Sequence, residues 1–507
     1  MLHRVVLAAF AVAASAWPAG LQASLESIAR QESLKYNCSF SIALRSGDGE
    51  VLAAGGVVDS TTNQQAQVSD KYPWGSVTKM FTAASIMKLA AAGNFSLDDK
   101  VAPLVDPLLA KMAASDPTQN FSSLSDLFGD AVADTSLRQL LGMTSGVPDF
   151  DTATPSRDGG ESKDPLRTML YDAPDLFDSP TELMKVSWVA GHWKDCKPFS
   201  SKFKAFCYSS TNFMLLGLVL AGQASSETWS SFDQSIHLPA SLRKELIFAN
   251  RGAPKDYGTA HGYDRTSYNR PRGDDNDHDN WGVDGVFAGW TASNIVATSS
   301  TVAHLAWEIF GPPQGIAPKE FVDQMIPSAS EFYGLGAFNL GSFTGHKGGP
   351  LGVGYGHLGA TYGYQSIAGY FPELNIAMAI ATNIETDTQA QPADAFCLAY
   401  NAVAGLAWPN HMIQITDHSK QQQNNNKTTK QQAHHNKLLF GTRLGGRGCA
   451  GQDQHLERAG IRVVVVVVVV VFLSDFVLLC LFGFALFVAL CSFPPKEGKL
   501  SGYKLCR

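Results

Sequence analysis

A serine and a lysine three residues apart, Ser76 and Lys79, stand at the start of an apolar segment and directly follow Trp74-Gly75. Residues three apart lie on one face of a helix, so the hydroxyl and the amine are predicted to be neighbours. In this arrangement the lysine accepts or holds the hydroxyl proton, and the free backbone N–H groups of a first helical turn favour developing negative charge. The pair therefore predicts a serine nucleophile.

The Ser-x-x-Lys spacing alone is weak evidence. It occurs five times in this chain, starting at Ser76, Ser85, Ser201, Ser241 and Ser501. Ser85 is predicted in mid-helix, where the backbone N–H groups are already hydrogen-bonded and cannot hold an oxyanion. Only Ser76 follows an aromatic–glycine turn and precedes an unbroken helical pattern, which closes at Gly93. The ordinary alternative is a helix start without chemistry, and further motifs must decide.

Two more segments combine polar side chains with small residues. The first runs from Phe206 to Gly217 and places Tyr208, small hydroxyls and an amide directly before an apolar helix. The second is Gly356-His357-Leu-Gly359-Ala360, at the start of a predicted strand. Glycines there allow another backbone to approach closely and to add to a sheet edge. Both segments are candidates for lining a cleft.

The elements that must position these residues begin near the N-terminus. Four apolar residues mark a first helix: Leu25, Ile28, Ala29 and Leu34. Phe40, Ile42 and Leu44 then alternate as a strand, and Ser46-Gly-Asp-Gly49 is typical of a hairpin turn.

The last predicted elements are two strands, residues 365–370 and 376–382, joined by the turn Pro372–Asn375, and a helix over about 392–405. Strands at both ends with helices between them predict an α+β fold. Its antiparallel sheet comes from both chain termini and is flanked by helices, with a mainly helical domain inserted in the middle. The site is expected in the cleft between these two parts.

In this order, Ser76-x-x-Lys79, Tyr208-x-x and His357-x-Gly359 resemble the three motifs of the serine β-lactamase and penicillin-binding-protein superfamily. The closest resemblance is to its β-lactamase-related branch, which holds class C β-lactamases, D-alanyl-D-alanine carboxypeptidases, D-aminopeptidases and esterases. Leu137 to Pro148 also resembles the helix-to-loop element of that branch. The resemblance spans residues 24–408 and implies the β-lactamase/transpeptidase-like fold.

The resemblance implies a role for each matching residue. Ser76 is the expected acylated nucleophile, Lys79 its proton partner, and Tyr208 a general base or acid whose pKa neighbouring cations would depress. The backbone N–H groups of Ser76 and Ala360 are expected to form the oxyanion hole, and His357 to face a substrate carboxylate or the tyrosine. The implied substrate-binding residues are Ser210, Asn212, His357, Gly359 and Ala360.

One departure concerns the second motif, where the family's asparagine is replaced by Ser210. Asparagine there binds the substrate amide, so a hydroxyl indicates altered substrate choice or weakened activity, which Asn212 would partly offset. The leading interpretation is a secreted serine hydrolase acting through an acyl-enzyme on an amide or ester, such as a D-amino-acid peptide or a small ester. The alternative is a catalytically silent homologue that binds a ligand or partner in the same cleft. The sequence leaves carboxypeptidase and esterase types open.

Four cysteines lie in the hydrolase region: Cys38, Cys196, Cys207 and Cys397. An even number suits an oxidising compartment. Cys196 and Cys207 flank a short loop before Tyr208, which favours a disulfide there. The resemblance brings the first and last segments onto one sheet and thereby implies Cys38–Cys397 as the second pair, although four cysteines allow three connectivities.

The chain has 507 residues and a formal charge of −7, which gives no reason to expect nucleic acid. The absence of His-Glu-x-x-His, Cys-x-x-Cys and phosphate-binding glycine motifs gives no support for a metal or cofactor. The expected partner is a small-molecule or peptide substrate.

Both ends of the chain have their own character. Residues 1–23 are typical of a signal peptide, with cleavage after Ala16 or Ala23, which predicts a secreted protein. The hydrolase domain is expected over 24–408, followed by a Gln-, Asn- and Lys-rich disordered segment over 409–462. Residues 463–507 are apolar and include nine consecutive valines. They are either a membrane anchor or translated repeat sequence from an incorrect gene model.

Overall fold

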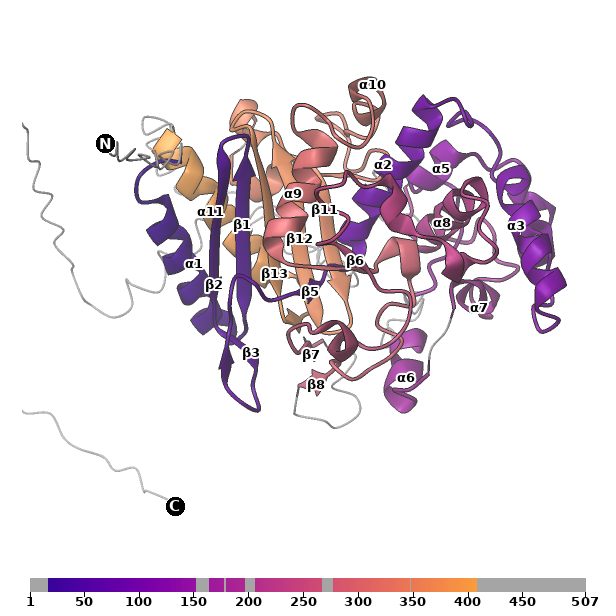
Figure 1. The fold of residues 1–507 in the computed structure, drawn as a ribbon, viewed down its shortest axis with the longest axis horizontal. Helices are drawn as coiled ribbons and strands as arrows, with labels where there is room; N and C mark the ends of the chain where they lie inside the picture. Colours follow the sequence, from indigo (N-terminus) through magenta and orange to yellow (C-terminus); the bar gives the residue numbers. More distant parts are fainter. Residues whose placement is uncertain are drawn as a thin grey trace, which may run out of the picture. The chain divides into compact units, whose positions relative to one another are not determined.

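A six-stranded antiparallel sheet joins the beginning and the end of the described chain in the computed structural model (Figure 1). The strand order is β10-β11-β12-β13-β1-β2. β1 pairs with β13 from Phe40↔Thr382 to Arg45↔Ala377, so the predicted sheet from both termini is confirmed. Its strands are β1 (Phe40–Ser46), β2 (Gly49–Gly55), β10 (Phe338–Asn339), β11 (Tyr355–Thr361), β12 (Tyr364–Phe371) and β13 (Ile376–Thr382).

The structure describes residues 17–151, 164–176, 179–196, 206–266, 277–346 and 348–407. The first 16 residues of the predicted signal peptide, the segment 409–462 and the tail 463–507 lie outside these ranges. Within them, no helix is both long enough and apolar enough to cross a membrane.

Helices cover both faces of the sheet. Tyr370 and Phe371 are neighbours in β12 and therefore point to opposite faces. Tyr370 contacts Trp307 of α9 (Ser299–Phe310), whereas Phe371 contacts Phe396 of α11 (Ala390–Ala407). α1 (Leu21–Tyr36) packs beside α11. This double cover explains why every residue of β12 and β13 is buried.

The predicted first helix is present, but one of its four marker residues does not face the core. Leu25 and Ala29 are buried, whereas Leu34 is 79% exposed. The predicted helix is therefore confirmed, but Leu34 does not belong to its buried face. Scattered exposed leucines are ordinary on protein surfaces and need no partner.

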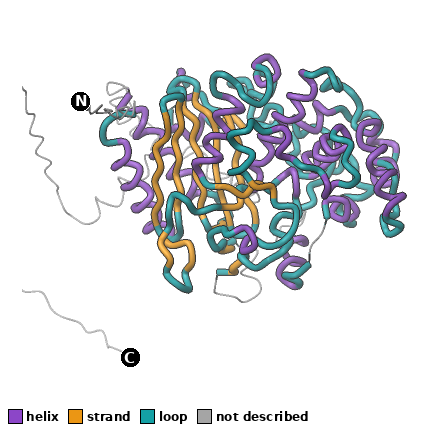
Figure 2. The backbone as a smooth tube through the Cα atoms, viewed as in Figure 1, coloured by secondary structure: helices purple, strands orange, loops and turns teal. Residues whose placement is uncertain are grey.

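The second part of the domain is mainly helical and lies beside the sheet, as Figure 2 shows. It contains α2 (Thr78–Ala91), α3 (Ala102–Ser115), α4 (Leu124–Phe128), α5 (Leu137–Leu141), α6 (Pro165–Asp172), α7 (Pro180–Lys185), α8 (Thr211–Gln223) and α10 (Lys319–Val322). The short strands form three small sheets, β3-β4, β5-β9-β6 and β14-β7-β8. These strands are β3 (Val57–Asp59), β4 (Gln64–Gln65), β5 (Tyr72–Pro73), β6 (Ile247–Phe248), β7 (Tyr263–Asp264), β8 (His278–Asp279), β9 (Ile295–Ala297) and β14 (Ile384–Glu385).

α2 is the helix that connects the two parts. It contacts β11 and α9 of the sheet layer and also α8 of the helical part. Its residues are buried nearly all round, which fits a sequence with apolar residues on every face. Ser76 lies in the 3₁₀ turn η1 (Gly75–Val77) directly before α2, and Lys79 lies in the first turn of α2, so the proposed nucleophile lies at the junction of the two parts.

Candidate active site

The turn that carries Ser76 packs directly on the sheet. Gly75 has a φ of +51°, and a Cβ at this position would lie 2.5 Å from the carbonyl oxygen of Ala360 in β11. Glycine is therefore required twice, by the backbone conformation and by the close approach. Ser76 itself remains partly exposed, whereas its neighbours Gly75 and Val77 are buried.

Gly359 serves the same contact from the other side. A Cβ there would lie 2.1 Å from the carbonyl oxygen of Trp74, which also accepts a hydrogen bond from Ser366 Oγ at 3.0 Å. The space that the sequence assigned to a substrate backbone at Gly359 is thus filled by the nucleophile turn. This places Ala360 beside Gly75, while its part in an oxyanion hole stays a prediction.

Lys79 is fully buried, and its Nζ lies among three oxygen atoms. It donates to Ser76 Oγ at 2.8 Å, to Ser210 Oγ at 3.1 Å and to the carbonyl oxygen of Ala292 at 3.0 Å. Burial lowers the pKa of Lys79 to about 8, against the opposing attraction of Asp151 and Asp149. A lysine with this pKa is partly neutral near pH 8, so it can accept the proton of the Ser76 hydroxyl.

Tyr208 lies beside this lysine, with Lys79 Nζ 5.2 Å from its ring centroid. Burial raises the pKa of Tyr208 well above its ordinary value, although hydrogen bonding to Ser76 and Ser210 opposes the shift. The depressed pKa expected from the sequence is therefore wrong in direction. Two features explain the error: the phenol is desolvated, and Asp149 and Asp151 also raise its pKa. A neutral Tyr208 is suited to donate a proton rather than to accept one.

His357 is buried and does not offer a cation to the site. Its Nδ1 contacts the carbonyl oxygen of Leu358 at 2.6 Å, and its Nε2 contacts the hydroxyl of Tyr333 at 3.1 Å. Because a carbonyl oxygen only accepts, Nδ1 carries the proton and Nε2 accepts from Tyr333. Burial and Lys79 hold the pKa of His357 well below its ordinary value. The second cation expected to act on Tyr208 is therefore absent from this position.

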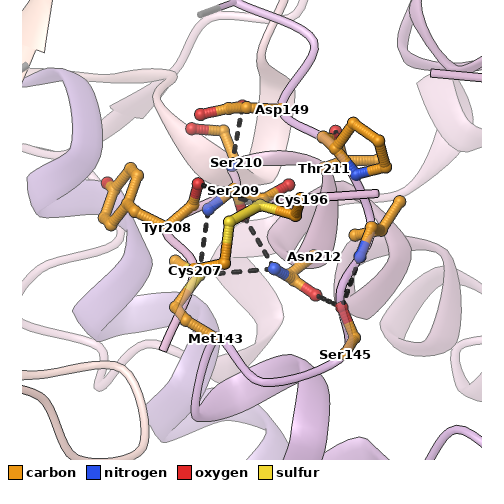
Figure 3. The surroundings of a disulfide bond; sticks show 12 residues. Met143, Ser145, Asp149, Cys196, Cys207, Tyr208, Ser209, Ser210, Thr211 and Asn212 are labelled. Carbon is orange, nitrogen blue, oxygen red and sulfur yellow. Dashed lines mark hydrogen bonds between the residues drawn. A yellow bond between two sulfur atoms is a disulfide. The ribbon is translucent and has the colours of Figure 1, made fainter. Parts of the chain in front are cut away.

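The side chains of the second motif form hydrogen bonds in two directions, and Figure 3 shows the one from Asn212 to Ser145. Ser210 Oγ accepts a hydrogen bond from Lys79 Nζ. Asn212 instead accepts from Ser145 Oγ at 2.6 Å and donates to the carbonyl oxygen of Ser209 at 3.0 Å. The amide of Asn212 is therefore used to fix the loop at Ser145, and it does not take the place of the asparagine missing at Ser210.

Sequence reasoning missed two carboxylates at this site, Asp149 and Asp151. Asp149 Oδ1 accepts a hydrogen bond from the backbone N–H of Ser210 at 2.9 Å (Figure 3). Burial, the neighbouring Asp149 and a hydrogen bond to it raise the pKa of Asp151 well above its ordinary value. The two carboxyl groups therefore interact with each other beside the second motif. The signal available in the sequence was two acidic residues two apart, directly after Gly146-Val-Pro148.

Ala292 was also missed, because it contributes only a backbone carbonyl. It lies in the short 3₁₀ helix η8 (Trp290–Ala292), which packs against α2 and α8. A main-chain acceptor cannot be recognised from the residue type.

Among the residues that the structure describes, no group of three or more His, Cys, Asp or Glu side chains is arranged to hold a metal ion.

The predicted Cys196–Cys207 disulfide is confirmed and lies next to Tyr208 (Figure 3). The backbone N–H of Cys207 donates to Met143 O at 2.9 Å, and that of Cys196 donates to Gly146 O at 3.0 Å. Both ends of the bridge are thus fixed to the same loop that holds Ser210 and Asn212. The disulfide restrains the backbone that delivers Tyr208 to the site.

The predicted Cys38–Cys397 disulfide is wrong. Cys38 is a buried free thiol at the junction of α1 and β1, whereas Cys397 is itself disulfide-bonded. Cys397 lies on the face of α11 that carries Asn401, whose Nδ2 donates to Thr344 O at 2.9 Å. The backbone N–H of Cys38 instead donates to Ser33 O at 3.3 Å. The two ends of the domain do meet, but these two residues face different neighbours.

Comparison with known proteins identifies this fold. A family model described as Beta-lactamase matches residues 39–399. D-amino acid amidase from Ochrobactrum anthropi SV3, complexed with D-phenylalanine, is similar with a TM-score of 0.56 and 18% identity, covering 76% of this chain and 99% of that chain. D-stereospecific amidohydrolase from Streptomyces sp. gives a TM-score of 0.52 and 19% identity, covering 76% of this chain and 98% of that one.

A third similar structure is the octameric penicillin-binding protein homologue from Pyrococcus abyssi, with a TM-score of 0.53 and 22% identity, covering 76% of this chain and 77% of that one. At these identities the likeness shows a shared fold. No curated protein matches the chain by sequence.

Proposed function

We propose that this chain, which belongs to the Beta-lactamase family over residues 39–399, is a secreted serine hydrolase that forms an acyl-enzyme on an amide or ester. The family and the fold are those of serine hydrolases of the β-lactamase and penicillin-binding-protein type. Two similar structures are described as a D-amino acid amidase and a D-stereospecific amidohydrolase. A D-amino-acid amide or peptide and a small ester are therefore the substrates to test first.

The geometry supports a sequence of proton transfers that begins at Lys79. Neutral Lys79 accepts the proton of Ser76, and Ser76 Oγ attacks the substrate carbonyl carbon to form a tetrahedral intermediate. Collapse of that intermediate breaks the bond to the leaving group, which takes a proton from the phenol of Tyr208, and the Lys79 ammonium restores the phenol proton. A water molecule then attacks the carbonyl carbon of the acyl-enzyme and gives a proton to neutral Lys79. The second tetrahedral intermediate collapses, the bond to Ser76 Oγ breaks, and the Lys79 ammonium returns the proton to Ser76 as the acid is released.

The single observation that carries this proposal is the 2.8 Å contact between Lys79 Nζ and Ser76 Oγ, made by a fully buried lysine whose pKa is lowered to about 8. A nucleophile and its base within hydrogen-bonding reach are the geometric requirement for this chemistry. The same contact argues against a silent homologue that only binds a ligand, because binding alone does not require a deprotonable lysine at a partly exposed serine.

Covalent labelling tests the proposal. The purified protein is treated with a fluorophosphonate and the adduct is mapped by peptide mass spectrometry, with Ser76→Ala as the test variant. Ser85→Ala is the matched control, because Ser85 is three residues before Lys88 on the same helix but donates to Phe81 O within the helix at 2.9 Å. Labelling at Ser76 that survives in Ser85→Ala and disappears in Ser76→Ala supports the proposal. A folded protein that takes no label would instead favour the silent homologue.

The secreted location is tested by the mature N-terminus. The Cys196–Cys207 bridge is what an oxidising compartment favours. Leu21 opens α1 and is buried, so removal of the first helical turn would expose core, and this favours cleavage after Ala16 over Ala23. N-terminal sequencing of protein from the medium is expected to begin at Trp17. Intact Met1 on all of the folded, active protein would contradict secretion through this segment.

A further inference from the structure

Two basic side chains, Lys79 and His357, lie beside Tyr208. They are the described residues that could bind a negatively charged group of the substrate at this position. Lys79 Nζ lies 5.2 Å from the tyrosine ring centroid, and the His357 ring centroid lies 6.3 Å from it. Whether they can bind a carboxylate depends on their charge and on their free hydrogen-bond donors. This question concerns the leaving-group side of the substrate and rests on the function proposed above.

His357 has neither the charge nor a free donor. Its one N–H is used by Leu358 O, and its other nitrogen accepts from Tyr333, so no ring N–H remains for a ligand. Aromatic rings also enclose it, with the ring centroids of Phe338 and Tyr333 at 4.7 and 5.7 Å. Protonating this imidazole would bury a cation against the hydroxyl of Tyr333 and the charge of Lys79. We conclude that His357 is a neutral packing residue.

Lys79 carries charge in its protonated form but has no donor to spare. An ammonium group has three N–H donors. All three are used, by Ser76 Oγ, Ser210 Oγ and the carbonyl oxygen of Ala292. A substrate carboxylate would have to displace one of these partners, and displacing Ser76 would break the pair that performs the reaction.

Two carboxyl groups also act on the two catalytic groups. In the part of the chain that the structure describes, the other charged side chains that act on both Lys79 and Tyr208 are those of Asp149 and Asp151. A carboxylate brought beside Tyr208 would lose its water, gain no free donor from Lys79 or His357, and face this acidic pair.

We propose that the substrate's leaving group carries no carboxylate, so that the protein acts on amides or esters whose leaving group is neutral or cationic and discriminates against peptides with a free C-terminal carboxylate. The arrangement of donors around His357 and Lys79 is the physical cause. Of the carboxypeptidase and esterase types that the sequence leaves open, the proposal excludes the carboxypeptidase type, and it adds amides with an uncharged leaving group to the esters.

The test compares substrates that differ only in this charge. One pair is N-acetyl-D-phenylalanyl-glycine and N-acetyl-D-phenylalanyl-glycinamide, and the other is 4-acetoxybenzoate and methyl 4-acetoxybenzoate. We expect the uncharged member of each pair to have a kcat/KM about tenfold or more above that of its carboxylate. Equal values, or a preference for the carboxylate, would overturn the proposal. If turnover is too slow to measure, protection of Ser76 against fluorophosphonate gives the same comparison.

A double variant locates the cause. Asp149→Asn together with Asp151→Asn removes both ionisable carboxyl groups and keeps an oxygen acceptor for the Ser210 N–H. We expect it to narrow the preference for the uncharged substrate by about threefold or more. Asp98→Asn is the control, because Asp98 is exposed, pairs with Arg138 and follows the C-terminal end of α2, and it should leave the ratio unchanged. The wild-type ratio decides the proposal even if the double variant does not fold, and a failure to label Ser76 at all refutes the proposed function instead.

Discussion

Two buried basic side chains in this protein have opposite surroundings. Arg167 of α6 contacts three carboxylates, those of Asp164 at 3.1 Å, Asp264 at 2.7 Å and Glu385 at 2.8 Å. Lys79 contacts two hydroxyls and one carbonyl. Both side chains are removed from water, so the difference between them comes from their partners.

The partners decide whether each charge is fixed. Burial acts to lower the pKa of Arg167, but Glu385 and Asp264 outweigh it, and its pKa is raised well above the ordinary value. Burial lowers the pKa of Lys79 to about 8, and the attraction of Asp151 and Asp149 opposes this effect of burial only in part. Charged partners in contact hold a cation permanently, whereas neutral acceptors support a cation that can lose its proton. The first arrangement serves structure and the second serves chemistry.

Making the lysine charge permanent should have the largest effect. Lys79→Arg replaces a group that can deprotonate with one that cannot. We expect kcat/KM to fall by roughly 10³-fold, in the range for loss of a general base. Lys88→Arg on the same helix is the control and should retain activity. Near-normal activity in Lys79→Arg would show that Lys79 is not the base.

Removing the fixed cation should destabilise the fold. Arg167→Met leaves three buried carboxyl groups without their cation, and we expect a loss of about 3–5 kcal/mol in the free energy of unfolding. Urea denaturation followed by circular dichroism measures it. Arg138→Met is the comparison, because Arg138 pairs with Asp98 at an exposed site, and it should cost less than about 1 kcal/mol. Equal losses in both variants would contradict the distinction drawn here.

The labile charge should appear in the pH dependence of the reaction. The active form of Lys79 is neutral, so kcat/KM should rise with pH through about 8 and fall about tenfold per pH unit on the acid side. Asp149 and Asp151 face this lysine, while the pKa of Tyr208 is raised and that of His357 is lowered, so neither of these two accounts for a step near pH 8. A flat profile between about pH 6 and pH 9 would contradict this assignment.

The smallest effect is expected from changing one neutral acceptor. Ser210→Ala removes one of the three oxygens that stabilise the Lys79 ammonium, so the acid limb of the profile should move to lower pH, by less than about one unit. Ser209→Ala is the matched control, because in the described part of the chain the neighbouring Ser209 Oγ has no hydrogen-bond partner. If the acid limb of the kcat/KM profile does not move in Ser210→Ala, or moves equally in both variants, Ser210 does not stabilise the Lys79 ammonium.

The sequence predicted the parts of the molecule whose signals are local. The β12–β13 hairpin was readable from two apolar runs joined by Pro372–Asn375, and β1 from its alternation. Ser76 and Lys79 are three residues apart on one helical turn, so their contact needed no knowledge of the fold. Ser210 reaches Lys79 because the helical part brings α8 against α2, which the motif order indicated but residue types alone did not.

What the sequence could not predict depends on surroundings. A histidine beside a glycine motif was expected to carry charge, but Tyr333 and Phe338 enclose it, and they are remote in sequence from His357. The pKa direction of Tyr208 was missed for the same reason, because desolvation is a property of the packed site. Asp149 acts on the backbone of Ser210, and Ala292 acts through its own carbonyl, so neither contact has a distinctive pair of residue types.

The pairing of β1 with β13 also affects how this protein is made. A ribosome delivers the chain from its N-terminus, so the β1–β2 hairpin emerges early, while its partner β13, residues 376–382, is translated near the end of the domain. During that interval the β1 edge has unpaired backbone groups beside apolar side chains, which is the condition that promotes aggregation and chaperone binding. We therefore expect the nascent protein to need protection of that edge until its last sheet strands have been synthesised.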